Sequence, residues 1–366
     1  MRIGIVGGGA SGCFLAIRLK ELNPSFSVTI IERNDKLMKK IAVTGNGRCN
    51  YANLGDLKGK YNNDEFANKI INNLPPYHLV NQFDEYGIHP TLIDHLVYPV
   101  SLSAQTVMLM LEKRLKELGV KVYLNEDVLD YQKKDHSYTL KTSLSMHVFD
   151  ILVFTSGGKA YPQLGTNGAI LDIMKQHGYL IEALSPSLCP IKVKENTKRV
   201  SGQRVKCHVS LINDNKLFYE EDGEVLFKDD GLSGIVILNM STKINGLKNK
   251  DKVRIVLDLA NGQNNIKEAD YEQYVHPKVA AYLRDNHLNI NNISFTFKAF
   301  YDYNIAEVSH GGIMINEVSD SLESKKEKGL YFAGEILDVD GMCGGYNLMF
   351  AFASAETVAQ GIKNYV

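Results

Sequence analysis

The chain opens with two short apolar runs separated by a segment of helical periodicity. Residues 3–6 read Ile-Gly-Ile-Val and residues 28–31 read Val-Thr-Ile-Ile, and such continuous apolar runs are typical of buried parallel strands. Between them Ala10, Phe14 and Ile17 recur at the spacing of one helix face. The pattern predicts a strand–helix–strand unit at the start of the chain.

A mixed α/β texture continues to about Ser185. Helical spacing and alternation predict a helix over 64–74, a helix over 103–118 and an antiparallel meander over 127–131 and 137–142. Another continuous apolar run, at 149–154, predicts a further buried strand. The first half of the chain is therefore expected to belong to one α/β domain.

Beyond Ser185 apolar and polar positions alternate. Strands are predicted over 204–212, 217–227 and 252–259, followed by a helix over 271–285. Asp222-Gly223 lies between two short apolar runs and predicts a hairpin turn. Parallel-strand texture returns at 329–334, and a helix is predicted over 348–362. The pattern indicates an antiparallel, β-rich domain inserted into the α/β domain.

Composition and charge narrow the classes of function. The 366 residues are 44% apolar and 23% charged, which is ordinary for a globular protein, and the length favours two domains. The net charge is −1, so no broad basic field is present and no nucleic-acid partner is expected. We expect no signal peptide, no membrane span and no metal. The five cysteines are scattered and odd in number, which indicates free thiols and a cytoplasmic location.

The first motif fits the dinucleotide-binding pattern G-x-G-x-x-G. Gly7 permits the tight turn after the strand, Gly9 lets the backbone approach a diphosphate, and Gly12 lets helix and strand pack closely. The start of the helix, with Ala10 and Ser11, offers N–H groups to the phosphates. Glu32 ends the next strand, where an acid binds the adenosine ribose. A glycine turn without ligand leaves this order unexplained, so we expect NAD or FAD, and the acid disfavours NADP.

A second motif, residues 44–50, reads Thr-Gly-Asn-Gly-Arg-Cys-Asn. Its glycine amides are suited to close contact with a ligand, and Arg48 to a phosphate or a reduced flavin. A structural ion pair is the alternative for Arg48. For Cys49 a small packed side chain is favoured over a thiol that faces the flavin.

The third motif combines Gly334-Glu335 at the end of an apolar strand with a glycine pair before the last helix. In many two-domain flavoproteins the acid faces the ribityl chain, and the helix start lies under the flavin pyrimidine edge. Helix N–H groups there stabilise the negative charge of reduced flavin. This element favours FAD over NAD; the alternative is a plain strand–loop–helix. Asp338 and Asp340 are assigned no acid–base role.

Together the motifs resemble the aminoacetone oxidase family of FAD-binding proteins, which includes a bile-acid enone reductase branch. The resemblance runs along nearly the whole chain and is carried by residues 7–12, 44–50, 157–162, 231–234, 309–312 and 329–348. It implies an α/β fold with a Rossmann-type FAD-binding domain, of the two-dinucleotide-binding-domain type, from residues 1–186 and 309–366. It also implies an inserted antiparallel β-barrel-like domain over 187–308 that covers the substrate.

Carried over by position, the resemblance implies a set of cofactor contacts, with Val128 meeting the adenine through its backbone. The implied contacts are Gly7, Gly9, Ala10, Ser11, Gly12, Glu32, Arg33, Lys40, Thr44, Gly45, Asn46, Gly47, Arg48, Cys49, Val128, Gly157, Gly334, Glu335, Gly345, Tyr346, Asn347 and Leu348. The sequence departs from the family around residues 227–235, and the insert is short. Both departures fall in the substrate-covering domain, so the substrate of a relative is not carried over.

The expected function is an FAD-dependent oxidoreductase that acts on a small organic molecule by hydride transfer through the flavin. No second G-x-G-x-x-G is present, so the second partner is a transiently bound NAD(P)H or oxygen. Arg48, Tyr161 and His310 are catalytic candidates, each with a structural role as the alternative. Two other functions stay open, an FAD protein acting on tRNA or another macromolecule and an NAD dehydrogenase without flavin. A redox pair of Cys49 and Cys343 is conceivable.

Overall fold

A computed structural model describes residues 1–365 of the chain. The chain divides into two compact units, one formed by Met1–Ser185 together with the residues from Val308 onward, and the other by Pro186–Glu307. The two ends of the chain therefore build one unit, and the middle builds the second. Among the described residues, no helix has the length and apolar character to cross a bilayer.

A five-stranded parallel sheet, in the order β19-β10-β1-β2-β6, forms the centre of the first unit. Val6 lies opposite Ile31 on one side and Phe154 on the other, so the predicted apolar runs are neighbours. These runs are buried on both faces, as continuous apolar strands require. The strands are β1 (Arg2–Val6), β2 (Ser27–Ile31), β6 (Lys121–Tyr123), β10 (Ile151–Phe154) and β19 (Leu330–Phe332).

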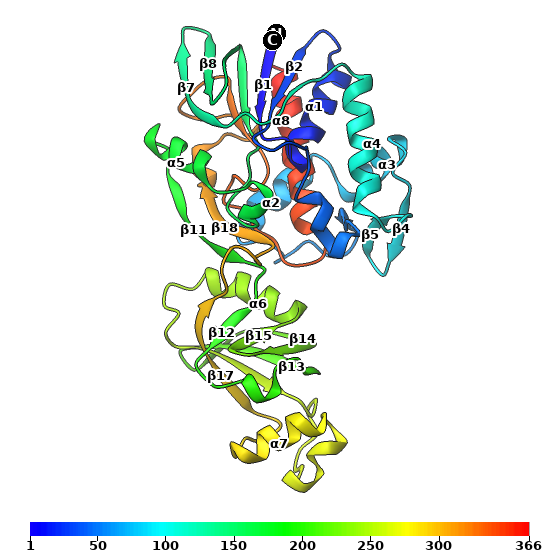
Figure 1. Ribbon diagram of the computed structural model, residues 1–366, viewed down its shortest axis with the longest axis vertical. Coiled ribbons are helices and arrows are strands. Elements are labelled where there is room, and N and C mark those ends of the chain that lie inside the picture. Colours follow the sequence, from blue (N-terminus) through cyan, green and yellow to red (C-terminus); the bar gives the residue numbers. More distant parts are fainter. Residues whose placement is uncertain (366) are drawn as a thin grey trace. The chain divides into compact units, whose positions relative to one another are not determined.

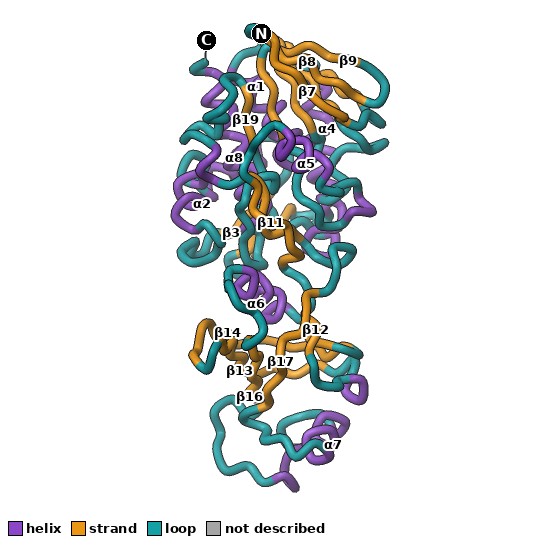
Figure 2. The backbone as a smooth tube through the Cα atoms, turned by 90° about the vertical axis from the view of Figure 1, so that its left-hand side faces the viewer, coloured by secondary structure: helices purple, strands orange, loops and turns teal. Residues whose placement is uncertain are grey.

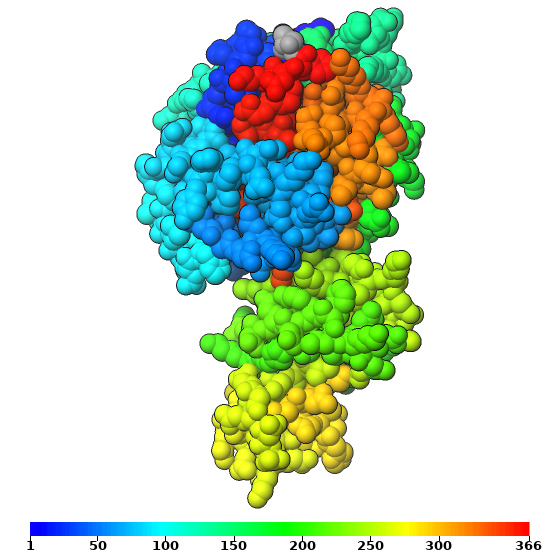
Figure 3. Space-filling model, turned by 180° about the vertical axis from the view of Figure 1, so that it is seen from behind, coloured from blue at the N-terminus to red at the C-terminus, as the bar shows by residue number. Residues whose placement is uncertain are grey.

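Helices from both chain ends cover one face of this sheet. Phe14 of the first helix contacts Phe352 of the last, with ring centroids 5.3 Å apart, and the two helices lie side by side (Figures 1 and 3). Phe83 packs against the same ring at 4.9 Å. The helices of this unit are α1 (Ala10–Leu22), α2 (Asp64–Ile71), α3 (Pro76–Glu85), α4 (Ala104–Glu117), α5 (Ala169–Gln176) and α8 (Tyr346–Lys363).

The helix predicted over 64–74 ends earlier than expected, at Ile71. The pattern missed the next helix, α3, which begins at Pro76. Proline favours the first position of a helix because its nitrogen has no hydrogen to leave unpaired there. A proline pair interpreted as the end of one helix is therefore also the start of another.

The predicted meander is confirmed and packs on the other face of the parallel sheet (Figure 2). Gly4 of β1 has no room for a Cβ atom because the ring of Phe149 occupies that space. Short sheets complete the unit. The remaining strands are β7 (Val128–Lys134), β8 (Ser137–Thr142), β9 (Met146–Phe149), β3 (Ala52–Asn53), β4 (Pro90–Ile93), β5 (Leu96–Pro99), β11 (Ile181–Ser187) and β18 (Val308–Ile313).

The second unit is a closed six-stranded barrel in the order β12-β15-β14-β13-β16-β17. Alternate residues of β13 and β16 point into its apolar core, as the predicted alternation requires. The fold class is therefore confirmed, including the barrel. The elements are β12 (Ile191–Val193), β13 (Arg204–Asn213), β14 (Lys216–Lys228), β15 (Gly231–Ser233), α6 (Ile235–Asn245), β16 (Val253–Asp258), α7 (Pro277–Asp285) and β17 (Ile293–Phe300).

The hairpin predicted at Asp222-Gly223 is wrong. Both residues lie inside β14, where they pair with His208 and Cys207 of β13. The turn lies at Asp214 and Asn215, which both adopt left-handed backbone (φ 50° and 61°), a conformation that Asp and Asn tolerate. Gly223 serves another purpose, because a Cβ atom there would lie only 3.0 Å from Val236 of α6.

Candidate active site

The three motif glycines at the end of β1 differ in the space around them. A Cβ atom on Gly12 would overlap the carbonyl oxygen of Gly7, so only glycine lets α1 approach the strand end. Gly7 has a φ of 105°, and a Cβ atom there would lie 2.8 Å from the carbonyl oxygen of Thr155. Gly9 faces open space, with no atom within 4 Å of its Cβ position. This is the pattern that a diphosphate-binding turn needs.

The start of α1 presents N–H groups that the helix does not use. The first helical hydrogen bond runs from the Cys13 N–H to the Gly9 carbonyl at 3.0 Å, so the N–H groups of Ala10, Ser11 and Gly12 have no helical acceptor. The Ser11 hydroxyl donates to the carbonyl oxygen of Ala351 at 2.8 Å. Ser11 can therefore bind a phosphate through its N–H and not through its hydroxyl.

Glu32 is held beside the glycine turn. Its Oε2 accepts the Gly8 N–H at 2.7 Å, and its Oε1 accepts the backbone and side-chain N–H groups of Asn34 at 2.8 Å. The carboxylate is buried. Parallel pairing of β1 and β2 brings this acid to the turn, so the predicted glycines and acid do form one group. Asn34, which fixes the carboxylate, was missed because nothing in its local sequence marks it.

Arg33, which follows β2, is connected to Val128, the first residue of β7, through the neighbouring Asp127. The guanidinium of Arg33 pairs with Asp127 at 3.0 Å, directly before Val128, and donates to the Gly165 carbonyl oxygen at 3.2 Å. Both charged groups are partly exposed, so the pair contributes little stability. Its effect is to connect the end of β2, the start of β7 and the segment around Gly165.

Ser156, at the end of β10, has a buried hydroxyl without a hydrogen-bond partner among the described residues. Its Cα would lie 2.9 Å from a Cβ atom on Gly7, so it is next to the glycine turn. Buried polar atoms without partners are rare and mark places where a ligand or water completes the bonding. The sequence signal for Ser156 is only its place in the small-residue run 155–158.

Lys40 and Glu335, predicted separately, form an ion pair. The Lys40 ammonium lies 2.7 Å from Glu335 Oε2, and the Ser309 N–H donates to Oε1 at 2.9 Å. Gly157 borders the same carboxylate. The Ser309 hydroxyl accepts the N–H groups of Lys159 and Ala160, so Ser309 ties β18 to the end of β10.

The loop over 44–49 and the start of α8 meet at Asn50. A Cβ atom on Gly45 would lie 3.1 Å from the Asn50 nitrogen, and one on Gly345 would lie 2.7 Å from the Asn50 side-chain amide. The loop turns through left-handed backbone at Gly45, Asn46 and Gly47. Thr44 fixes its start, because its hydroxyl donates to the Ile41 carbonyl oxygen at 2.8 Å. Two predicted cofactor segments are thus neighbours.

Cys49 is packed inside the protein. Its side chain has no exposed surface, and burial raises the pKa of its thiol to about 12. The small packed side chain, which the sequence favoured over a thiol facing the flavin, is the one observed, and a contact of Cys49 with FAD stays a prediction.

Gly345 directly precedes α8 and has left-handed backbone (φ 85°). As a glycine it supplies no side-chain hydrogen bond to the N–H groups at the start of this helix. The Asn347 side chain exchanges hydrogen bonds with the backbone of Gly341, at 2.8 and 2.9 Å. The Tyr346 hydroxyl donates to the Asp56 carbonyl oxygen at 3.1 Å. The side chains of Asn347 and Tyr346 thus hold the loop before α8 in place. A ligand at this helix start would meet helix N–H groups and the partly exposed Leu348.

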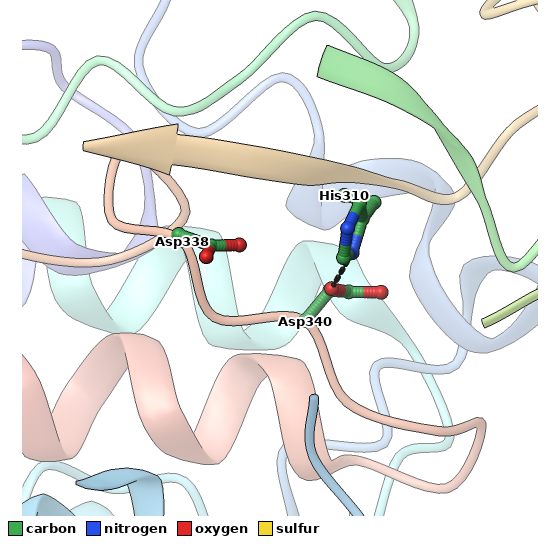
Figure 4. Close-up of side chains that lie close together, drawn as sticks. All are labelled: His310, Asp338 and Asp340. Carbon is green, nitrogen blue, oxygen red and sulfur yellow. Dashed lines mark hydrogen bonds and ion pairs between the residues drawn. The ribbon is translucent and has the colours of Figure 1, made fainter. Parts of the chain in front are cut away.

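The three catalytic candidates have different surroundings. Arg48 is exposed, and its guanidinium has no partner among residues 1–365. Tyr161 has left-handed backbone (φ 55°) directly before Pro162. His310 is largely buried, and its Nδ1 lies 2.8 Å from Asp340 Oδ1 (Figure 4).

Asp338 lies close to this His–Asp pair. Ligand atoms of His310, Asp338 and Asp340 lie within 4.8 Å of one another. Asp338 accepts the side-chain amides of Asn62 at 2.9 Å and Asn63 at 3.1 Å, and these donors direct hydrogens at the carboxylate. We therefore interpret the group as a hydrogen-bonded network and assign no metal ligand to it.

Comparison with known proteins decides the family. Residues 1–361 match a family model described as the HI0933-like protein Rossmann domain. The chain belongs to the HI0933-like family. It is 27% identical to 3-dehydro-bile acid delta(4,6)-reductase of Clostridium scindens, over 96% of this chain and 97% of the relative. It is also 27% identical to ribosomal RNA dihydrouridine synthase of Haemophilus influenzae, over 98% of both chains.

Solved structures show the same fold at low identity. A 3-ketosteroid-delta4-(5alpha)-dehydrogenase from Rhodococcus jostii RHA1 is 11% identical, with a TM-score of 0.53 over 99% of this chain and 96% of that chain. A quinol–fumarate reductase is 13% identical, with a TM-score of 0.54 over 99% of this chain and 70% of that chain. This HI0933-like protein is an enzyme of the FAD-dependent oxidoreductase class.

The residues of this HI0933-like protein fit FAD. The glycine turn has an open face at Gly9 and leads to the unused N–H groups of α1. Glu32 accepts the Gly8 N–H of the same turn, and Ser156, whose hydroxyl has no partner among the described residues, borders Gly7. A dinucleotide diphosphate needs N–H donors and a close backbone approach, and its ribose needs an acid. The second glycine element, before α8, is what a flavin requires and a nicotinamide dinucleotide does not.

The cysteines of this protein yield a direct prediction. Cys13, Cys49, Cys189 and Cys207 are buried and Cys343 is partly exposed. We expect one thiol per native chain to react with a disulfide reagent, and all five after denaturation. The count should be the same for oxidised and reduced enzyme. A native count that rises on reduction, and falls back with the Cys49→Ser variant, would instead support a redox pair.

Proposed function

We propose that this enzyme uses FAD to reduce a carbon–carbon double bond conjugated to a carbonyl group in a small organic molecule. The names of the curated relatives support this chemistry. A 3-dehydro delta(4,6) bile acid carries ring double bonds near a ketone, and dihydrouridine is a uracil ring that has lost its double bond. The common change is the addition of two hydrogens to an unsaturated carbonyl compound, which favours a reductase over an aminoacetone oxidase.

The observation that carries the proposal is the group of free N–H donors and the buried acid at the carboxyl ends of β1 and β2. There the N–H groups of α1 would bind the FAD diphosphate, Glu32 the ribose, and the Val128 backbone the adenine. Lys40, Glu335 and the loop over 44–49 would orient the ribityl chain. Bound FAD supplies hydride transfer between an electron carrier and the substrate.

The electron carrier is proposed to be a transiently bound NAD(P)H. The chain has one G-x-G-x-x-G, so no second dinucleotide domain is available to hold a nicotinamide permanently. The scattered, odd-numbered cysteines of the sequence favour the expected cytoplasmic location, where NAD(P)H is available.

Turnover without oxygen tests the proposal. Enzyme is mixed with NADH or NADPH and either cyclohex-2-enone or 4-androstene-3,17-dione, with cyclohexanone as the matched control that has the carbonyl but no double bond. We expect NAD(P)H oxidation only with the unsaturated ketones, and a product with two added hydrogen atoms. Peroxide formation from small amines with oxygen, without any enone reduction, would contradict the proposal and indicate an oxidase.

A second candidate function is reduction of a uracil in RNA. It is favoured by the two relatives named ribosomal RNA dihydrouridine synthase, at 27% and 26% identity over nearly the whole chain. The net charge of −1 offers no broad basic field for the phosphate backbone. Incubation of reduced enzyme with ribosomal RNA transcripts, followed by nucleoside mass spectrometry, separates the two. Dihydrouridine formation that weakens steeply with salt, and no enone reduction, would establish the RNA function.

A further inference from the structure

We propose that His310 is the proton donor of the proposed reduction and that Asp340 is the residue that positions and charges it. This role rests on the proposed function, because adding hydrogen across a polarised double bond needs a proton as well as a hydride. His310 was one of three candidates in the sequence, and Asp340 was assigned no part in acid–base chemistry. The contacts around the pair separate His310 from the other two candidates.

The hydrogen bonds of His310 assign its two nitrogens. Nδ1 lies 2.8 Å from Asp340 Oδ1, and the Asp340 side chain has no exposed surface. A buried carboxylate only accepts, so Nδ1 carries a hydrogen. Nε2 has no hydrogen-bond partner among residues 1–365, while the His310 side chain keeps 14% of its surface exposed. The second nitrogen is thus oriented by the first and left for a ligand.

The charges around His310 favour its protonated form. Burial alone would lower the pKa of the imidazole, but the hydrogen bond and charge of Asp340 outweigh it, and Asp338 and Glu182 add to the effect. The net pKa of His310 is raised above its usual value. Asp340 and Asp338 come from the loop after β19, and Glu182 from β11, which pairs with β18. These surroundings favour the form of His310 in which Nε2 carries a proton that it can give away.

Asp338 is the second carboxyl group of this network. Burial raises the pKa of its carboxyl group above the usual value, against the opposing effects of the His310 charge and the Asn63 amide. The Asn62 side chain also accepts the Asp340 N–H at 2.9 Å. The amides thus hold both aspartates of the loop in place around the histidine.

His310 and Asp340 lie on two segments that also carry proposed cofactor contacts. The Ser309 N–H donates to Glu335. His310 is the next residue of β18, so its side chain lies on the opposite face of the strand from the Ser309 side chain. Asp338 and Asp340 lie on the loop between Glu335 and Gly345, the two ends of which are proposed to meet FAD. A loop whose two ends are proposed to meet FAD therefore carries Asp338 and Asp340, and Asp340 pairs with His310 of β18.

The other two candidates are less suited to this step. Arg48 carries a guanidinium, a group that stabilises negative charge in proteins but does not act as a proton donor. Tyr161 carries a left-handed backbone conformation before Pro162, and a phenol is a weaker acid than an imidazolium. His310 has a buried carboxylate, Asp340, that orients its ring and favours its charge.

The balance of the step is simple. A hydride joins the carbon distant from the carbonyl, the Nε2 proton of His310 joins the carbon next to it, and the double bond becomes a single bond. His310 is left neutral and regains a proton from water. The electrons come from NAD(P)H, which is oxidised to NAD(P)⁺. Without a proton donor the negative charge would stay on the substrate, so this step should depend on His310.

Two variants and one control test this assignment. His310→Asn keeps an N–H donor at the position of Nδ1 for Asp340 but removes the Nε2 proton. Asp340→Asn removes the charge that holds the proton on His310. His208→Asn is the matched control, because His208 also pairs with an aspartate, Asp222, at 2.8 Å, but lies in the barrel unit. All are studied as the full-length FAD enzyme.

The measurement separates the two half-reactions. Enzyme is reduced by NAD(P)H without oxygen, and the rate of flavin reduction reports folding and cofactor binding. Reduced enzyme is then mixed with cyclohex-2-enone, and the rate of reoxidation reports substrate reduction. We expect His310→Asn to leave the first rate within about twofold and to lower the second by about 100-fold or more, the usual effect of losing a general acid. His208→Asn should change neither.

The pH profile tests Asp340. Because the protonated form of His310 is the donor, the reoxidation rate should fall as pH rises through the raised pKa of His310. In Asp340→Asn that fall should move to lower pH, which loss of structure alone would not produce. Wild-type reoxidation rates in His310→Asn would overturn the proposal, and this variant decides alone if Asp340→Asn does not fold. An unchanged pH profile in Asp340→Asn would overturn the role of Asp340. Wild-type enzyme that no enone reoxidises would instead refute the proposed function, and this role with it.

Discussion

Replacing Gly9 with valine should leave the fold intact and weaken FAD binding by about 5- to 150-fold, from a clash of about 1–3 kcal/mol at about 1.4 kcal/mol per tenfold. Gly9 has extended backbone (φ −81°, ψ −160°) that any residue adopts, and its Cβ position faces open space. The added side chain therefore meets nothing in the protein and occupies the place proposed for the diphosphate. FAD titration of the apoprotein, followed by flavin fluorescence, measures the affinity.

Gly12→Ala is the matched comparison for this variant. Its methyl group would overlap the Gly7 carbonyl oxygen, so α1 must shift away from the strand end and the apoprotein itself should lose stability. Thermal unfolding without FAD should distinguish the two, with Gly9→Val melting like the wild type and Gly12→Ala melting earlier. Wild-type FAD affinity in a folded Gly9→Val protein would mean that the diphosphate lies elsewhere.

Replacing Glu32 with alanine should weaken FAD binding by about 10- to 150-fold, the equivalent of about 1.5–3 kcal/mol for hydrogen bonds to a charged group. The carboxylate accepts N–H groups from Gly8 and Asn34 and is proposed to bind the ribose hydroxyls. Its removal also leaves the buried Gly8 N–H unpaired, which should cost the apoprotein about 1–3 kcal/mol of unfolding free energy. Both effects follow from one side chain that the turn and the ligand share.

Asp35→Asn is the control, because Asp35 is three residues further along the chain and its side chain is 61% exposed in a pair with Lys39. Its substitution should leave the stability close to that of the wild type, as is usual for exposed surface residues. Equal FAD affinity in Glu32→Ala and Asp35→Asn, measured by the same titration, would remove Glu32 from the proposed site.

The parts of the fold that the sequence predicted are those governed by local patterns. The run at residues 3–6, the glycines from Gly7 to Gly12 and the run at 28–31 each determine their own conformation and follow one another without interruption. The hairpin was placed wrongly because both Asp222-Gly223 and Asp214-Asn215 have turn-forming residues. The choice between them depends on the pairing of β13 with β14 and on α6 beside Gly223, which are tertiary contacts.

The sequence predicted which segments form the candidate site, but it did not predict which residues of these segments contact one another. The Ser11 hydroxyl donates to the carbonyl oxygen of Ala351, and Lys40 forms an ion pair with Glu335. His310 pairs with Asp340. The first two of these pairs join residues about 300 positions apart, beyond any local pattern. Such partners decide whether a side chain is available to a ligand, as the buried Cys49 also shows.

The most direct test of the central claim is a single reaction without oxygen. Purified enzyme with bound FAD is reduced with dithionite, freed of excess reductant and mixed with cyclohex-2-enone in one sample and cyclohexanone in another. The flavin absorbance should return only with cyclohex-2-enone, and cyclohexanone should form in equal amount to the enzyme-bound FAD. A purified protein that binds no FAD, or a reduced flavin that oxygen reoxidises while every unsaturated carbonyl compound leaves it reduced, would contradict the account.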